Sequence, residues 1–281
     1  MAIVVASDLS PRSWAPLARG VQLARDLRQN LHVVHVFDGD LPKVAHVAII
    51  EGATQILGRE CARLGFEPKI EIIAGSAKTE VVRYALDVSA KMIVVGRHDE
   101  EKDGFFQFSD TTAGKIARLS PLPVLLVKDE PARPYRAVVV GVDFSIYSLS
   151  AIRHASSIAP DGSLYLIHAY QVAFRSRLGT EEYLAEVKKD ARQAFDRFMT
   201  QEMAELTRRA SVPQAKDASL QSEVIEGMPY EVLVGSVKRL DVDLLVVGTH
   251  GAGRLARTIW GSVAAALLED PPCDLLIVHE T

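Results

Sequence analysis

Cysteine is scarce in this chain of 281 residues, which has only Cys61 and Cys273. Two cysteines are too few for a disulfide framework or a cysteine-based zinc site, so we expect small buried hydrophobes. No uninterrupted apolar run approaches the roughly 18 residues that a membrane helix needs. The opening segment, MAIVVASDLS, has no basic residues and reaches Asp8 too early for a signal peptide. These absences predict a cytoplasmic protein without a membrane partner.

Basic stripes are also missing. The net charge is −4, so nucleic acid is not an expected partner. No GxxxxGK[ST] phosphate loop occurs, and a loose dinucleotide fingerprint, Gly251 to Ala256, follows a fourth strand rather than a first. No catalytic triad or carboxylate pair can be assembled, and the histidines lack metal-ligand spacings. We expect most histidines to be satisfied strand or helix residues.

The two halves of the chain repeat each other. Apolar segments that end in Asp-x-Ser open both halves, at residues 3–10 and 139–145, and segments sharing a histidine follow at 31–36 and 164–169. Later segments pair in the same order: 69–73 with 222–225, 92–96 with 244–248, and 123–127 with 275–278. Helical sequence separates them. A repeat of this length indicates two copies of one domain.

The apolar segments are continuous runs of Val, Ile and Leu, as expected of parallel strands covered by helices on both faces. The sequence therefore predicts the α/β class, with two tandem doubly wound five-stranded parallel-sheet domains. The proline-containing segment 128–136 serves as the linker. We place the domains at residues 1–130 and 131–281. A charged amphipathic helix is expected at Glu181–Arg208.

A glycine-rich loop follows the fourth strand of the second half. Its spacing is G-x2-G-x9-G-S, formed by Gly248, Gly251, Gly261 and Ser262. Glycine lets the backbone approach a ligand closely, and Gly261-Ser262 opens a helix whose free N–H groups attract anions. The Ser262 hydroxyl can cap that helix or bond a phosphate oxygen. The loop therefore predicts a phosphate site, or else a simple turn with a serine cap.

The glycine spacing, the Asp143-Phe144-Ser145 segment and the Pro272-Cys273 pair resemble the universal stress protein family over nearly the whole chain. The resemblance implies the fold of that family, which is adenine nucleotide α-hydrolase-like. It also implies ATP, with Mg²⁺, as the bound cofactor. The implied nucleotide-binding residues are Asp143, Ala169, Gly248, Gly251, Gly261, Ser262 and Val263, with Ala169 facing adenine and Asp143 near the metal. Thr249 and His250 lie between the motif glycines and could reach phosphate.

The first half departs from this pattern. Sliding it onto the second places Asp99 on Gly251 and Asp110 on Gly261, in a strongly acidic loop that is one residue longer. Two like charges about 4 Å apart repel by roughly 4 kcal/mol at the effective dielectric of a protein surface. We therefore expect no ATP in the first half, although an uncharged or cationic ligand stays open there.

The expected function is an ATP-binding regulator of stress response, with one nucleotide in the second half and at most slow hydrolysis. Two alternatives stay open. The chain could be a protein-interaction module that binds no nucleotide, or a slow ATPase or nucleotidyl transferase. The last strands of the two halves could pair internally as a pseudo-dimer, and a homodimer is a further option. The sequence names neither the stress nor a regulatory protein partner.

Overall fold

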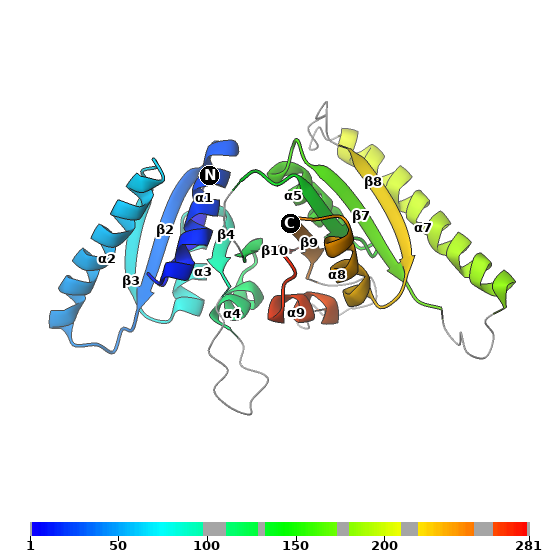
Figure 1. Ribbon diagram of the computed structural model, residues 1–281. Helices are drawn as coiled ribbons and strands as arrows, with labels where there is room; N and C mark the ends of the chain where they lie inside the picture. The colour runs from blue at the N-terminus through cyan, green and yellow to red at the C-terminus, as the bar shows by residue number, and fades with distance from the viewer. Residues whose placement is uncertain are drawn as a thin grey trace. The chain divides into compact units, whose positions relative to one another are not determined.

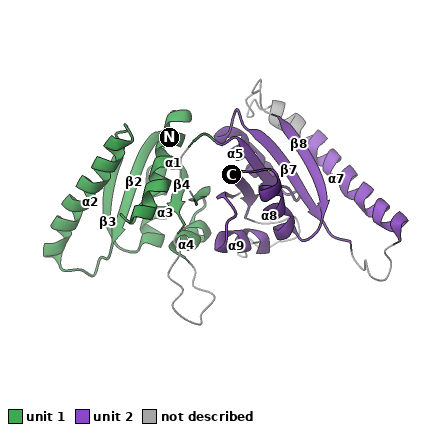
Figure 2. Cartoon of the chain, viewed as in Figure 1, with its two compact units in different colours: residues 1–134 green, residues 135–281 purple. Residues whose placement is uncertain are grey.

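The computed structural model describes residues 2–97, 111–128, 133–172, 180–208, 219–249 and 261–279, with positions 202–208 described by their backbone alone. The chain divides into two compact units, Met1–Pro134 and Tyr135–Thr281 (Figure 2). Each unit has its own parallel sheet and its own helices. Within the described ranges, no helix combines the length and hydropathy needed to cross a bilayer.

In the first unit, strands and helices alternate along the chain (Figure 1). The strands are β1 (Ala2–Ala6), β2 (Asn30–Phe37), β3 (Lys69–Ala74), β4 (Ala90–Gly96) and β5 (Val124–Val127). The helices are the 3-10 turn η1 (Pro11–Ser13), α1 (Trp14–Asp26), α2 (Lys43–Arg63), α3 (Ala77–Asp87) and α4 (Thr112–Leu119). The strand order is β3-β2-β1-β4-β5.

The second unit repeats this architecture. Its strands are β6 (Ala137–Gly141), β7 (Ser163–Tyr170), β8 (Leu220–Glu226), β9 (Leu244–Gly248) and β10 (Asp274–Val278). The described helices are α5 (Ile146–Ile158), α7 (Glu181–Arg208), α8 (Pro229–Arg239) and α9 (Ser262–Glu269). The order β8-β7-β6-β9-β10 matches that of the first unit. All pairings within each unit are parallel, which confirms the predicted fold class.

The central strands are buried because helices cover both faces of each sheet. Val4, Val5 and Ile93 in the first unit, and Val139 and Leu245 in the second, are fully buried. This explains why the strands lack the alternating pattern of a half-exposed sheet. The predicted helix at 181–208 is present as α7, and its Phe195 lies in the core.

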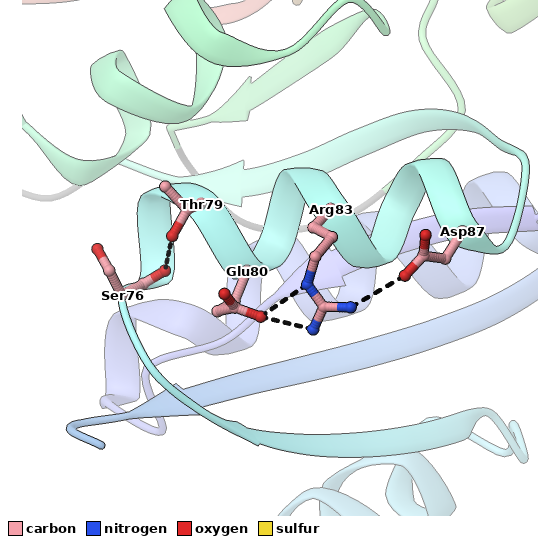
Figure 3. A network of polar contacts seen from close by, with 5 residues as sticks. All are labelled: Ser76, Thr79, Glu80, Arg83 and Asp87. Carbon is pink, nitrogen blue, oxygen red and sulfur yellow. Dashed lines mark hydrogen bonds and ion pairs between the residues drawn. The ribbon is translucent and has the colours of Figure 1, made fainter. Parts of the chain in front are cut away.

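Helix α3 shows how the helices meet solvent. Glu80 accepts two hydrogen bonds from Arg83, whose Nη1 also donates to Asp87 Oδ2 at 3.1 Å, while Thr79 Oγ1 donates to the Ser76 carbonyl (Figure 3). These groups lie on the exposed side of the helix, where ion pairs contribute little to stability. The opposite side buries Val81 and Ala85 against the sheet.

Each sheet has a switch point where the strand order reverses, between β1 and β4 in the first unit and between β6 and β9 in the second. Ligands of doubly wound folds bind outside the carboxyl ends of the strands at this point. The loops that follow β6 and β9 are therefore the place to look for a site.

Candidate functional site

The turn after β6 holds Asp143 in a tight network. Asp143 Oδ1 accepts hydrogen bonds from Ser145 N at 3.1 Å and from the hydroxyls of Ser145 and Ser148, both at 2.6 Å. The Asp143 N–H in turn donates to Ser148 Oγ at 2.9 Å. Ser145 also caps α5, because its Oγ accepts from the Ser148 N–H at 3.3 Å. These bonds hold the Asp143 carboxylate at the carboxyl end of β6, beside the switch point.

Phe144 supports this turn in a strained conformation. Its φ of 65° lies in the left-handed region, which costs a non-glycine residue roughly 1–2 kcal/mol. Its ring packs on His168 with centroids 4.2 Å apart, and Phe198 and Phe195 of α7 lie at 5.5 and 6.1 Å. This aromatic cluster offsets the backbone strain and holds the turn against the sheet.

His168 joins β7 to the same turn. Its Nδ1 donates to the carbonyl of Val142 at 2.8 Å, and a carbonyl partner requires the proton to be on Nδ1. The first unit repeats the contact, because His35 Nδ1 donates to the Ser7 carbonyl at 2.8 Å. The expectation that the histidines are satisfied structural residues is confirmed here. Sequence reasoning noted the shared histidine but not its link to the Asp turn, although its recurrence in both halves was a usable signal.

Gly248 ends β9 directly against α5. A Cβ at this position would lie 2.5 Å from the Cβ of Tyr147, so only glycine fits. The next residue, Thr249, is 1% exposed, and its N–H donates to the Val278 carbonyl of β10 at 3.0 Å. The close approach brings the end of β9 beside the turn that carries Asp143.

A hydrogen bond joins the described ends of the glycine loop. The Gly261 N–H donates to the Thr249 carbonyl at 2.8 Å, which joins the end of β9 to the start of α9. Gly261 is the N-cap of α9, so the N-cap residue itself has no side chain with which to cap the helix. Ser262 is exposed and Val263 is half-buried at the first turn. A helix start with a glycine N-cap, next to a strand end, is a favourable place for an anion.

The predicted residues that the structure describes gather at one edge of the second sheet. Asp143 follows β6, Ala169 lies near the end of β7 in register with Ile225, and Gly248 ends β9. Gly261, Ser262 and Val263 open α9 beside Thr249. His250 and Gly251 lie outside the described residues. Ser145, Ser148 and Tyr147 were not predicted as site residues, because their roles depend on side-chain contacts.

The first unit caps the corresponding helix differently. Thr111 is the N-cap of α4, and its Oγ1 accepts from the Gly114 N–H at 3.0 Å. The bond from Lys115 N to Thr111 O matches the bond from Ala265 N to Gly261 O, so Thr111 corresponds to Gly261. The alignment of Asp110 with Gly261 was therefore wrong by one residue, and the first loop is longer by two. Asp99 and Asp110 themselves lie outside the described residues.

A family model agrees with this architecture. The model described as "Universal stress protein family" matches residues 1–128 and again 134–279. The chain belongs to the universal stress protein family. The repeated match also supports its interpretation as a tandem member.

Single relatives align with about half of this chain. A universal stress protein of Methanocaldococcus jannaschii is 29% identical over 151 residues, covering 52% of this chain and 83% of its own. One from Mycobacterium tuberculosis is 31% identical over 150 residues, covering 52% of this chain and 98% of its own. A solved universal stress protein of Archaeoglobus fulgidus covers 100% of this chain and 98% of its own, with a TM-score of 0.67 at 15% identity. That likeness concerns the fold.

Proposed function

We propose that the second unit binds one adenine nucleotide, ATP with Mg²⁺, and that the protein acts as a cytoplasmic regulator of stress response. The observation that carries the proposal is the hydrogen bond from Gly261 N to Thr249 O. This bond joins a helix start with a glycine N-cap to the residue that follows the glycine at the end of β9, beside the switch point. Backbone N–H groups and the positive end of α9 together favour a phosphate group there.

Small residues flank this point. Ala169 contributes only a methyl group near the end of β7, and Gly248 lets the end of β9 pack directly against Tyr147. The Ser262 hydroxyl is exposed at the helix start and can donate to a phosphate oxygen. In this proposal, Thr249 acts through its carbonyl, while Gly251 and His250 contact the phosphates from the loop between residues 249 and 261.

Asp143 is the proposed metal residue. Mg²⁺ is commonly bound by one or two carboxylates together with substrate phosphates, so a single aspartate is a sufficient protein ligand. Its Oδ1 accepts three hydrogen bonds, which hold the carboxylate in a fixed orientation. Among the described residues, no group of three or more His, Cys, Asp or Glu forms a metal cluster, so the phosphates would complete the coordination.

Regulation is the proposed output rather than turnover. An effective general base must reach the attacking water within hydrogen-bonding distance. The serine donors fix Asp143 in place and occupy its Oδ1. We therefore assign no catalytic residue and expect ATP hydrolysis to be slow at most.

The proposal is tested by mass spectrometry of nucleotides released from freshly purified, denatured full-length protein, followed by calorimetric titration with ATP and Mg²⁺. Bound ATP at about one equivalent is expected. ADP or AMP that accumulates with time would instead favour the slow ATPase or nucleotidyl transferase. A protein that is empty and also fails to bind added ATP with Mg²⁺ would leave the protein-interaction module as the function.

The oligomeric predictions stand apart from the nucleotide. The pairing of β5 with β10 as an internal pseudo-dimer, and a homodimer of whole chains, stay predictions. Sedimentation analysis of the full chain with and without ATP separates a monomeric chain from a homodimer. Absence of a homodimer would leave the nucleotide proposal unaffected.

A further inference from the structure

Helix α2 lies beside β3, the edge strand of the first sheet, and only its second half contributes buried side chains (Figure 1). The first buried residue of the helix is Ala53, so none of residues 43–52 enters the core. The start of the helix is nevertheless held in place. His46 Nε2 donates to the Leu41 carbonyl at 2.9 Å, and its ring packs edge-on against Phe37 of β2 with centroids 5.0 Å apart. The first turns of α2 are therefore an anchored part of the fold.

One face of this anchored segment is apolar and exposed to solvent. Val44 is 86% exposed, Val47 60% and Ile50 42%. At 3.6 residues per turn, Val44 and Ile50 lie about 60° to either side of Val47, so the three side chains share a face. Valine and isoleucine favour a helix less than alanine, leucine or charged residues do, so helix formation does not explain them at exposed positions. A contiguous exposed apolar face of this kind marks an interaction surface.

The second unit does not repeat this feature. Its counterpart, α7, connects β7 to β8 as α2 connects β2 to β3. Residues 181–190, the first ten of α7, include six charged side chains, whereas residues 43–52 include only Lys43 and Glu51. The repeat thus builds the equivalent helix with a charged, solvated start. The apolar start of α2 is therefore not a requirement of the fold.

The charges of the apolar face are arranged symmetrically about Val47. Lys43 lies four residues before it and Glu51 four residues after it, and both are exposed. A two-fold axis at Val47 pairs each residue before it with the residue equally far after it in a second copy. Val44 then meets Ile50, and Lys43 meets Glu51, each twice. Amphipathic helices that bind membranes are instead rich in Lys and Arg, whereas this face has no net charge.

We propose that residues 43–51 of α2 form a self-association surface, on which a second copy of this chain packs antiparallel about a two-fold axis at Val47. This inference rests on the homodimer proposed above and names its contact surface, and it does not involve the nucleotide. A segment of nine residues is about 14 Å long. It buries less than the roughly 1,200 Å² in total at which standard interfaces begin, so we expect a weak dimer with a dissociation constant of about 10–100 µM.

The test is sedimentation of the full chain between about 5 and 500 µM, which should show the wild type passing from monomer to dimer. Val47→Lys places two lysines at the axis and should weaken the dimer at least about tenfold, without changing ATP binding. Ile56→Lys is the control, because Ile56 is 40% exposed on the opposite side of the same helix. Melting temperatures check that both variants are folded. A dimer unchanged by Val47→Lys would refute the surface alone, and a chain that stays monomeric at 500 µM would refute the homodimer as well.

Exchange of the two charges tests the antiparallel pairing. Lys43→Glu and Glu51→Lys each replace two attractive contacts by two repulsive ones and should weaken the dimer about tenfold. In an equal mixture of these two variants every glutamate meets a lysine, so a heterodimer of nearly wild-type affinity should form. A mixture that associates no better than its components would refute the pairing. Binding of a monomeric wild type, but not of Val47→Lys, to phosphatidylcholine vesicles would identify a lipid surface and overturn the inference.

Discussion

Replacing Gly261 by aspartate places a carboxylate at the N-cap of α9, where the nucleotide proposal needs a phosphate. The backbone accepts the change, because Gly261 has a φ of −62° and a ψ of 139°, which any residue adopts. Aspartate is also among the best N-cap residues, and relative to glycine it stabilises a helix by a few tenths of a kcal/mol. The fold should therefore be as stable as before, or slightly more so.

The effect on ATP binding can be bracketed. Two unit charges about 4 Å apart repel by about 1 kcal/mol in water and about 4 kcal/mol at an effective dielectric constant near 20. Gly261 is half-buried and Ser262 is exposed, so the pair lies between these limits. Since each 1.4 kcal/mol is a factor of ten, we expect about a hundredfold weaker ATP binding.

The assay is a calorimetric titration of ATP with Mg²⁺ into wild-type, Gly261→Asp and Gly261→Asn proteins, at low and high salt. Asparagine has nearly the same shape and capping ability but no charge, so it should retain most of the affinity. Salt should reduce the difference between the two variants, because it screens the repulsion. Equal losses for aspartate and asparagine would show that size, not charge, matters at this position, and our account of the site would fail.

Three other predictions concern the scaffold. Gly248→Ala should destabilise the second unit and abolish ATP binding, because the new Cβ would meet Tyr147. Gly52→Ala in α2 is the control, because nothing lies within 4 Å of the new Cβ. In urea denaturation it should stabilise the protein by about 0.5–1 kcal/mol. His168→Phe removes the donor to the Val142 carbonyl, so it should lower the free energy of unfolding by about 1–3 kcal/mol and weaken ATP binding. The matched His35→Phe should lower the free energy of unfolding by a similar amount without affecting ATP binding. Burial, with a contribution from Glu60, raises the pKa of Cys61 from 9.0 to about 11, so this thiol should resist alkylation at pH 8 in the folded protein. Because the pKa of Cys61 is higher in the folded protein than in the unfolded one, the contribution of this thiol to the free energy of unfolding should be constant below pH 9 and fall as the pH rises toward 11. Cys61→Ala should reduce this fall when unfolding is measured as a function of pH.

Much of the fold follows from the sequence because buried parallel strands leave a strong signal. The apolar runs at residues 92–96 and 244–248 became β4 and β9, and the repeat placed them at equivalent positions in their sheets. The glycine that ends each run, Gly96 or Gly248, marked the end of the strand. These features depend on composition over several residues, so one substitution does not obscure them.

The details of the site could not be read in the same way. Counting residues aligned Asp110 with Gly261, but the start of α4 is set by the hydrogen bond between Thr111 Oγ1 and Gly114 N. Likewise, no spacing rule predicts that Ser148 both donates to and accepts from Asp143. Such contacts depend on side-chain torsions and on a left-handed Phe144, which tertiary packing decides.

The histidine-to-carbonyl hydrogen bond occurs in both units, so each unit can serve as a control for the other. His35 and His168 make the same hydrogen bond to equivalent turns. The two units therefore share a scaffold and differ mainly in the loops that it carries. Replacing residues 97–111 by residues 249–261 would therefore transfer the glycine loop to the equivalent position of the first unit. Such chimeras would test whether the loop alone decides which ligand a unit binds. The unchanged unit of the same chain would serve as an internal control for folding and binding.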